Sequence, residues 1–489
     1  MTLQELIRRA TSGLKLERHS LFRPSLAYEL LRDPFWVWCE YHAPRSEAVD
    51  ETSRYDEMKR QRGIEYEQAW VRKHYPEAVT IEPTFGLESL GNTLQAMLQG
   101  CPAISQPQLW DLGAETSGRS DLLVRDTSHR SDLGAYHYRL IEIKRSRALQ
   151  DYHTVQGALY NRMLGKIQGF LPPELTVVLH ETVEQVPYAA VERTLDDVLA
   201  TWRALRDGEL IPEPDRPPKA TNSPWRVYGN ALVEQRKDLT LLAGIQARER
   251  EKLRGAEIHS VGQLWNLGLK EVQAILGMKF GEQAYYTGQS YRTGRPILKP
   301  KCRLTIPRAK RHLYFDFETS DEVHPTEPPH VYLIGCWDVE QEEYVKFLAR
   351  GAEEERRIFR EFLDFIGDVQ AVRLYHWTDY EIGQMMDVIR RWPALEASIR
   401  RVITSCVDLK EAIKSAVYLP VPTFSLKCVA PALGFRWRQD GFGPFESMVC
   451  YWDYLDGTDE AAIERAILYN EDDCRGMWHV DCELTKRLG

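Results

Sequence analysis

The segment LYFDFETS (residues 313–320) places two carboxylates inside a run that otherwise has the composition of a buried β-strand. Asp316 and Glu318 are two residues apart, so in a strand both side chains point to the same face. Burying one unpaired carboxylate is unfavourable, and two neighbouring like charges are worse. The segment therefore requires a solvent-facing strand edge, a salt bridge or a metal site.

Acidic residues further along the chain favour the metal site. The segment HWTDYE follows a strand-like run and ends in Glu381, while YNEDDC places Tyr469 and Asp473 on one face of a helix. Acids from a first strand, a helix start and a late helix can hold two divalent cations about 4 Å apart, which activate a water molecule and stabilise the leaving oxygen. Bound cations also keep the clustered carboxylates ionised.

The order of these motifs over residues 311–485 resembles that of the DEDD (DnaQ-like) 3′–5′ exonucleases, which have the RNase H-like fold. The resemblance implies four acidic metal ligands, Asp316, Glu318, Glu381 and Asp473. It also implies that the Tyr469 phenol orients the attacking water. The second motif of the family usually has Asn and Asp. This chain has His376 and Glu381 there, and it resembles more closely a bacterial RNase H-like subfamily with the same Asp-to-Glu change.

Three further polar residues of this region are interpreted as follows. Lys427, in FSLKCVAPALGF, matches the same subfamily and is either a phosphate contact or a surface lysine. Asp472 is out of register with Tyr469, so we expect it to be solvated or to support the site without binding the metal. For Asp408 a structural role is favoured over a role as metal ligand.

A second set of polar residues occurs between positions 63 and 160. Glu67 lies on an expected helix, and Asp121 is near the start of the strand-like run SDLLVR. Glu142 and Lys144 share one face of the strand-like run YRLIEIKR. Gln156 and Tyr160 are one helical turn apart on a later helix. Hard carboxylate oxygens of this kind hold Mg²⁺ or Mn²⁺, while a lysine positions water or stabilises developing charge. Taken alone, Glu142 and Lys144 are more typical of an ordinary ion pair on an edge strand, and the ordered set as a whole favours the metal site.

The second set resembles the RecB-like branch of the PD-(D/E)XK nuclease superfamily, over residues 25–170. The resemblance implies three metal ligands, Glu67, Asp121 and Glu142. It gives Lys144 the catalytic lysine role, and it gives Gln156 and Tyr160 a role in handling DNA. The first motif of the branch often carries histidine at the position of Glu67, which is also a competent oxygen ligand.

Two proline-bearing segments, 210–225 and 292–311, divide the chain. Strand-like and helical patterns alternate on both sides of them, which is typical of α/β architecture. We predict a restriction-endonuclease-like PD-(D/E)XK domain at 20–209, a linker and small helical domain at 210–300, and an RNase H-like domain at 301–489.

The middle segment has two short helices around a glycine-containing turn, followed by a similar second unit, and it resembles helix–hairpin–helix modules. Such modules offer backbone N–H groups to a phosphate at a helix N-terminus. Gly244 takes the place of the first hairpin glycine, whereas Gln246 replaces the second. Nucleic-acid binding at Gly244 and a plain helical spacer both remain open.

The net charge of −9 over 489 residues argues against a uniformly basic binding protein, but a local basic channel is compatible with it. The basic runs KRQR (59–62), KRSR (144–147) and RAKR (308–311) each adjoin a motif described above. Such runs are either solvated faces or contacts to a phosphate backbone, which give affinity without sequence specificity.

The nine cysteines are scattered and form no CxxC pair, which favours reduced thiols. Many RecB-like relatives bind an iron–sulfur cluster through four cysteines, but only Cys39 and Cys101 precede residue 302, so no such cluster is expected. No apolar stretch approaches the roughly 20 residues that cross a bilayer, and the first residues lack the apolar core of a signal peptide. We therefore expect a soluble, cytoplasmic protein without a membrane partner.

These patterns predict a metal-dependent nuclease with two active sites that use Mg²⁺ or Mn²⁺. Its expected partner is nucleic acid, with DNA favoured over RNA, and its expected activity is exonucleolytic on single-stranded or frayed ends in repair or recombination. The alternatives are an RNA 3′–5′ exonuclease and a non-catalytic nucleic-acid-binding adaptor. No GxxxxGK[ST] motif is present, so any ATP-driven unwinding must come from a partner helicase.

Overall fold

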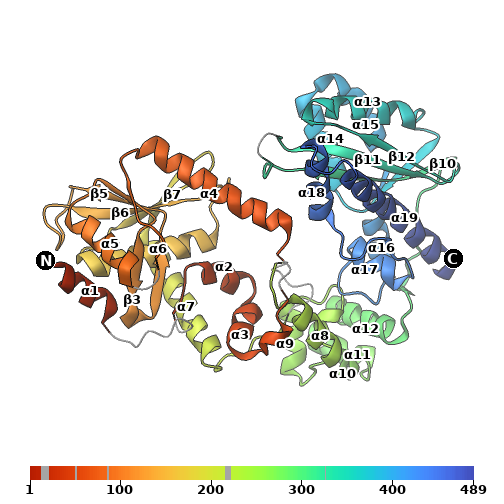
Figure 1. Ribbon diagram of the computed structural model, residues 1–489. Coiled ribbons are helices and arrows are strands. Elements are labelled where there is room, and N and C mark those ends of the chain that lie inside the picture. Colours follow the sequence, from red (N-terminus) through yellow and green to blue (C-terminus); the bar gives the residue numbers. More distant parts are fainter. Residues whose placement is uncertain (13–20, 50–51, 85–86, 215–221, 325–326, 489) are drawn as a thin grey trace. The chain divides into compact units, whose positions relative to one another are not determined.

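The computed structural model describes residues 1–12, 21–49, 52–84, 87–214, 222–324 and 327–488, and the chain divides into two compact units (Figure 1). Unit 1 contains the described residues of 1–51, 59–214 and 218–229. Unit 2 contains those of 52–58 and 230–489. The proline-bearing segment predicted at 210–225 lies partly outside the described residues. No helix in the described part of the chain is long and apolar enough to cross a membrane.

Unit 1 is built on a mixed sheet with the strand order β1-β2-β5-β6-β7-β8. Its strands are β1 (Val79–Thr80), β2 (Ala103–Ser105), β5 (Leu122–Asp126), β6 (His137–Ile143), β7 (Glu174–Val178) and β8 (Val183–Pro187). A separate hairpin joins β3 (Gln108–Asp111) and β4 (Thr116–Arg119). Strands β6 and β7 run parallel, and the helix α6 (Asp151–Gln168) is the crossover that this pairing requires.

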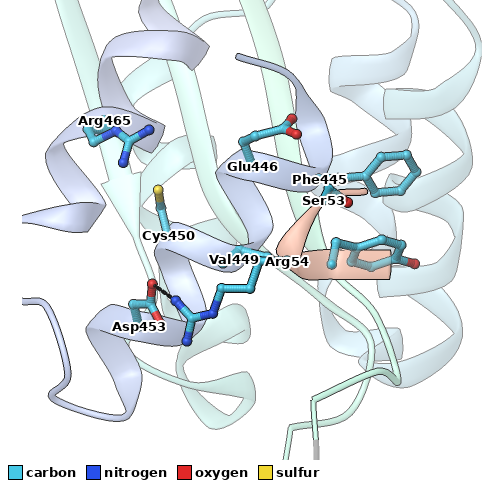
Figure 2. Close-up of a pocket in the computed structure, with 9 residues that line it drawn as sticks. Ser53, Arg54, Phe445, Glu446, Val449, Cys450, Asp453 and Arg465 are labelled. Carbon is cyan, nitrogen blue, oxygen red and sulfur yellow. Dashed lines mark hydrogen bonds and ion pairs between the residues drawn. The ribbon is translucent and has the colours of Figure 1, made fainter. Parts of the chain in front are cut away.

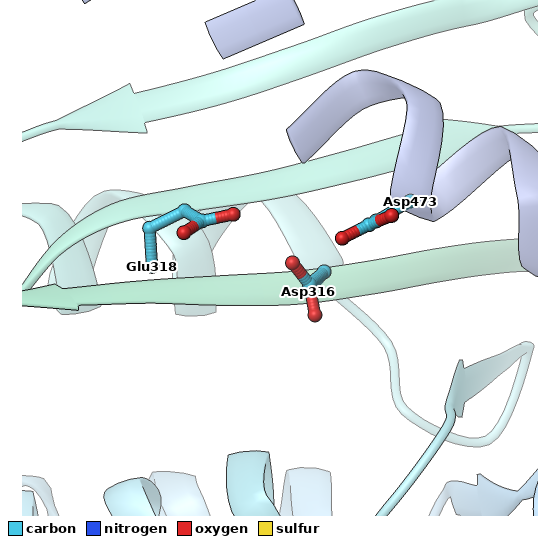
Figure 3. Close-up of side chains that lie close together, drawn as sticks. All are labelled: Asp316, Glu318 and Asp473. Atoms are coloured by element: carbon cyan, nitrogen blue, oxygen red, sulfur yellow. The ribbon is translucent and has the colours of Figure 1, made fainter. Parts of the chain in front are cut away.

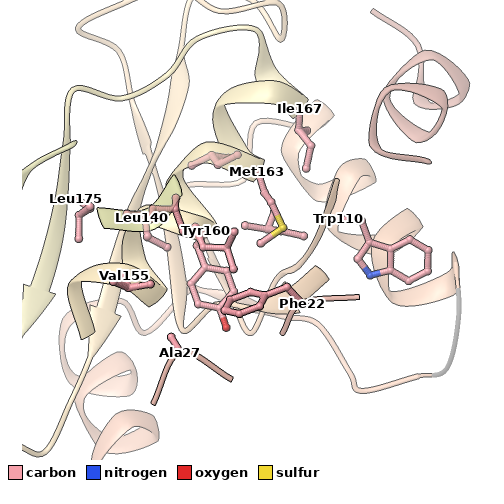
Figure 4. Close-up of a cluster of buried hydrophobic side chains, with 14 of the residues drawn as sticks. Phe22, Ala27, Trp110, Leu140, Val155, Tyr160, Met163, Ile167 and Leu175 are labelled. Atoms are coloured by element: carbon pink, nitrogen blue, oxygen red, sulfur yellow. The ribbon is translucent and has the colours of Figure 1, made fainter. Parts of the chain in front are cut away.

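The core of unit 1 surrounds α6 (Figure 4). Val155, Met163 and Ile167 repeat at helical spacing and are buried with Leu140 of β6 and Leu175 of β7. The other helices of the unit are α1 (Leu3–Thr11), α2 (Ser25–Arg32), α3 (Pro34–His42), α4 (Arg54–His74, which also contributes to unit 2), α5 (Leu87–Leu98) and α7 (Tyr188–Arg206). The strands predicted at SDLLVR and YRLIEIKR are confirmed as β5 and β6.

The C-terminal part of unit 2 has a five-stranded sheet with the order β12-β11-β10-β13-β14 among the described residues. Strands β10 (Arg311–Ser320), β11 (His330–Asp338) and β12 (Glu343–Leu348) are antiparallel neighbours. Strands β13 (Val372–His376) and β14 (Cys406–Asp408) continue the sheet in parallel with β10.

Helices cover both faces of this sheet. They are α13 (Glu355–Ile366), α14 (Tyr380–Arg391), α15 (Glu396–Ile403), α16 (Leu409–Ala416), α17 (Leu426–Ala432), α18 (Pro444–Leu455) and α19 (Ala462–Leu488). Along β10, Leu313, Phe315 and Phe317 enter the core shared with α13, α14 and α15. The alternate residues face the side on which α19 crosses β10 and β11 (Figure 1). The strand period of two therefore places Asp316 and Glu318 on one face, as predicted, and this face is the one that α19 crosses.

The middle segment forms α8 (Arg226–Arg236), α9 (Ala247–Gly255), α10 (Val261–Leu264), α11 (Leu269–Leu276) and α12 (Met278–Thr293), which enclose an apolar cluster of their own. Gly244 has φ +81° and lies so close to Gln283 that a Cβ would be 2.8 Å from its Nε2. A short ribbon of β9 (Ile297–Leu298) and β15 (Val417–Tyr418) connects this segment with the C-terminal sheet. The three-domain division stays a prediction.

The first residues of α4 also pack within unit 2. Ser53, Arg54 and Tyr55 line a small pocket of about 190 Å³ together with side chains of α18 and α19 (Figure 2). The Tyr55 ring is stacked on Phe445 at 4.4 Å, and Arg54 forms an ion pair with Asp453. The residues that line this pocket make structural contacts that hold the start of α4 against α18.

Candidate metal centre

Three carboxylates of unit 2 converge between β10 and α19 (Figure 3). One oxygen from each of Asp316, Glu318 and Asp473 lies within 4.8 Å of the other two. Asp316 and Glu318 come from adjacent same-face positions of β10, and Asp473 comes from the helix that crosses this face. Glu318 and Asp473 are buried, while Asp316 is partly buried.

The protein compensates this negative charge only in part. The Asn470 Nδ2 donates to Asp316 Oδ2 at 2.9 Å and to Glu318 Oε1 at 3.5 Å. Burial, and next the charge of Asp473, raises the pKa of Glu318 to about 8. Burial and the charge of Glu318 raise the pKa of Asp316 well above its usual range. A bound cation would oppose both shifts, because its positive charge favours the ionised carboxylates.

Glu381 lies in the first turn of α14, beside this cluster. It is 4% exposed, and within the described residues its buried Oε2 accepts no hydrogen bond, although His376 Nδ1 lies 3.7 Å away. Burial raises the pKa of Glu381 to about 7, and its charge in turn raises the pKa of Asp316. A buried carboxylate oxygen that accepts no hydrogen bond, close to Asp316, adds a donor to the three converging carboxylates, so these acids fit a hard divalent cation.

A lysine and two aromatic rings cover Asp473. Lys427 Nζ is 2.8 Å from Asp473 Oδ1, and the same oxygen accepts from Trp437 Nε1 at 2.6 Å. The ammonium lies 4.0 Å from the Trp437 ring centre and 4.1 Å from that of Tyr469. Burial, and next Asp473, raises the pKa of the Tyr469 phenol, which therefore stays protonated. The Lys427 side chain is 40% exposed and also pairs with Asp473, so its role as a phosphate contact or as a surface lysine stays a prediction.

A family model described as the RNase_H superfamily matches residues 313–485. Residues 313–485 form an RNase H-like domain. The match contains the whole carboxylate cluster, and an RNase H-like domain implies nucleic-acid binding, a nuclease-type function and divalent metals. A comparison with curated proteins found no match.

Two neighbours of the RNase H-like cluster differ from or extend the sequence-based expectations. Asp472 is not solvated: it is 3% exposed and accepts from the backbone N–H and the Nε of Arg438, at 2.8 and 2.7 Å. Asp408 has the structural role expected for it, because it accepts from the Glu411 backbone N–H and caps α16. The sequence did not predict that Asn470 and Trp437 belong to the site. The position of Asn470 directly after Tyr469 was the one feature that could have indicated it.

The second polar set is assembled in unit 1. Asp121 directly precedes β5, Glu142 lies near the end of β6, and Lys144 directly follows that strand. Lys144 Nζ is 2.9 Å from Glu142 Oε2 and 3.2 Å from Asp121 Oδ2. The Asp121 backbone N–H donates to Glu142 Oε1 at 3.3 Å, and Asp121 Oδ2 accepts from the Ile143 N–H at 2.7 Å. Adjacent antiparallel strands thus hold the two acids and the lysine together.

Glu67 reaches this group from α4. Burial, and next the charge of Asp121, raises the pKa of Glu67 to about 8, while its Oε1 accepts from Gln106 Nε2. The same two causes raise the pKa of Glu142 to about 7. Burial opposes the charge of Lys144, but Asp121 and Glu142 together raise its pKa well above the usual value. In the described part of the chain, only the cluster of the RNase H-like domain has three acidic oxygens within 4.8 Å of one another.

Gln156 and Tyr160 both contact backbone carbonyl groups. Gln156 Nε2 donates to the Pro24 carbonyl at 3.0 Å, and the Tyr160 hydroxyl donates to the Arg119 carbonyl at 2.6 Å. The Tyr160 ring belongs to the buried cluster of unit 1 (Figure 4). Both side chains thus fix segments around Asp121, and their role in handling DNA stays a prediction.

The basic run at 308–311 is largely committed to structural ion pairs. The guanidinium of Arg308 binds both carboxylate oxygens of Asp481 at 2.6 Å, and that of Arg311 binds Asp338 at 2.7 Å. Both acids are 1% exposed, so removing either arginine would leave a buried charge. Arg308 therefore links the segment before β10 to α19, and Arg311 links β10 to β11. Whether the run is a solvated face or a phosphate contact stays a prediction.

Proposed function

We propose that the chain is a metal-dependent nuclease with two active sites that hydrolyses phosphodiester bonds of DNA, as an exonuclease on single-stranded or frayed ends in repair or recombination. The observation that carries the proposal is the convergence of Asp316, Glu318 and Asp473, beside the buried Glu381 oxygen that accepts no hydrogen bond among the described residues. A structural ion pair does not explain four acids with so little compensating charge.

In the RNase H-like domain the four acids would hold Mg²⁺ or Mn²⁺, which supplies an activated water molecule and stabilises the leaving oxygen. The chain's own residues do the positioning. Tyr469 stays protonated and presents its hydroxyl at the edge of the cluster, where it can orient that water. Lys427 carries a positive charge beside Asp473, where a scissile phosphate would approach.

In unit 1, Glu67, Asp121 and Glu142 would hold the cation of the second site. Lys144 stays protonated between two of these acids and is placed to stabilise negative charge on a phosphate. The geometry is that of an acid pair on neighbouring strands with a third acid on a helix. We infer that the resemblance to RecB-like nucleases extends to activity, and that the middle helices contact the nucleic acid.

The test is cleavage of 5′- and 3′-labelled single- and double-stranded DNA and RNA, in Mg²⁺ and in Mn²⁺. Asp316→Asn and Lys144→Ala remove one site each, and the double variant is expected to be inactive. Asp387→Asn, on the exposed face of α14, is the matched control and should cleave as the wild type does. Undiminished cleavage by the double variant would refute the proposal. Cleavage of RNA but not of DNA would show that RNA is the substrate.

A further inference from the structure

A groove of about 590 Å³ lies within unit 2 between α12 and the segment that leads into α17. Tyr418 of β15 lines this groove, and its ring is stacked on that of Tyr286 with 5.3 Å between the ring centres. Its walls carry apolar side chains, of which Met278 is 72% and Phe280 is 40% exposed. Large apolar side chains open to solvent along one groove need an occupant.

The groove also carries three lysines, Lys279, Lys299 and Lys414. Lys279 has no hydrogen-bond or ion-pair partner among the described residues. Lys299 Nζ donates to the Lys414 carbonyl at 2.7 Å and lies 5.1 Å from the Tyr418 ring centre, and burial lowers its pKa. The single acid of the lining, Glu282, accepts from the Tyr418 hydroxyl at 3.2 Å. Lys414 Nζ is also 2.8 Å from Oε1 of Glu411, which lies outside the lining. The lining itself, with three lysines against Glu282, carries more positive than negative charge beside apolar and aromatic surface.

The groove is tied to the carboxylate cluster by one short segment. Phe424 lines the groove, and Lys427 forms the ion pair with Asp473. Three residues span at most about 11 Å of backbone, so the groove lies near the lysine whose side chain reaches the cluster. The Phe424 carbonyl is fixed by Trp377 Nε1 at 2.9 Å, directly after β13. The wall of the groove is thus anchored next to the strand end that precedes Glu381.

We propose that this groove binds single-stranded DNA and directs the strand into the RNase H-like site, which rests on the nuclease function proposed above. Bases would stack on Phe280 and Phe424, since every base has an aromatic face and such stacking is tolerant of sequence. Phosphates would pair with Lys279, Lys299 and Lys414. Gly244 lines the same groove, which places the middle helices on the path of the strand.

The first test measures binding of a fluorescent 15-nucleotide oligo(dT) to the full chain in EDTA, as a function of salt. Lys279→Glu and Phe280→Ala alter exposed side chains, so both variants should fold. The double variant should bind about tenfold more weakly. Lys279→Glu should also reduce the slope of log K against log salt by about 0.7 or more, whereas Phe280→Ala should leave the slope unchanged. Lys486→Glu, at an exposed lysine of α19, is the matched control for charge.

The second test separates the groove from the catalytic site. A p-nitrophenyl ester of thymidine 5′-phosphate reaches the carboxylates without filling the groove. The double variant, assayed in a Lys144→Ala background, should lose kcat/KM on oligo(dT) about tenfold and retain it on the ester. If the double variant kept its affinity for oligo(dT) and its kcat/KM on oligo(dT), the groove would not be a DNA-binding site. If the wild type bound oligo(U) more tightly than oligo(dT), RNA would replace DNA as the proposed ligand. If the chain cleaved neither substrate but the variants still bound oligo(dT) more weakly, the groove would be a DNA-binding site and the nuclease function would be refuted.

Discussion

Lys427 and Asp473 form a 2.8 Å ion pair at the edge of the carboxylate cluster in the RNase H-like domain. The ammonium is held between the rings of Trp437 and Tyr469, which places it by cation–π contacts on two sides. The ammonium of Lys427 is the cation that pairs with the Asp473 carboxylate among the described residues. A cation binding at Asp473 therefore has to share the carboxylate with Lys427.

Replacing Lys427 by methionine should tighten binding of Mn²⁺ while reducing cleavage. The apolar side chain keeps most of the contacts with Trp437 and Tyr469 but leaves Asp473 free for the metal. We expect affinity to rise by up to about tenfold, which corresponds to about 1.4 kcal/mol, and kcat/KM on DNA to fall because the phosphate loses a cation. Calorimetric titration with Mn²⁺ and a cleavage assay measure both. Lys486→Met should change neither, and unchanged Mn²⁺ affinity of Lys427→Met would contradict the competition.

Asn470 is predicted to organise the cluster without binding the metal. It is fully buried, its Nδ2 donates to Asp316, and its Oδ1 accepts from the Tyr344 hydroxyl at 2.8 Å. Asn470→Ala leaves both partners unsatisfied and should lower the free energy of unfolding by about 2–3 kcal/mol. Gly335→Ala should have a similar effect, because its Cβ would overlap the Asn470 side chain. Denaturant unfolding measures both variants, and a loss below about 0.5 kcal/mol in each would show that Asn470 is dispensable.

The alternation within LYFDFETS was sufficient to predict that Asp316 and Glu318 share one face, because the side-chain period of a strand is two. The contacts of Asn470 and Trp437 could not be predicted. Trp437 is 36 residues from Asp473, and only the path of the loop after α17 brings its Nε1 to that carboxylate. The burial of Asp472 could not be predicted for the same reason, since its partner Arg438 is 34 residues away; of its two expected roles, only the solvated one is wrong. The periodicity of a strand or helix determines which side chains share a face, whereas hydrogen-bond partners distant in the sequence depend on the path of the loops.

Lys144 is predicted to stabilise unit 1 as well as to act in cleavage. Lys144→Met removes the cation between Asp121 and Glu142 and leaves two acids facing each other. The metal-free variant should lose about 1–3 kcal/mol of unfolding free energy at pH 7.5, and Mn²⁺ should restore part of it. In an Asp316→Asn background its cleavage should fall by about 100-fold. Lys73→Met, at an exposed lysine of α4, is the control, and a Lys144→Met variant as active as this control would exclude the catalytic role.

The metal-free RNase H-like domain should become less stable as the pH rises. The pKa of Glu318 is about 8 in the folded protein and about 4.5 when exposed, so the folded state holds its proton more tightly. This contribution is fully present below pH 4.5 and is lost as the pH rises toward 8, at about 1.4 kcal/mol for each unit of pKa difference. Thermal unfolding in EDTA should therefore show Tm falling between pH 5.5 and pH 8.5, and Glu318→Gln should flatten this decrease. Saturating Mn²⁺ should raise Tm more at pH 8 than at pH 6, because ionised carboxylates bind the cation. An equal decrease of Tm in the wild type and in Glu318→Gln would show that this carboxylate does not set the pH dependence.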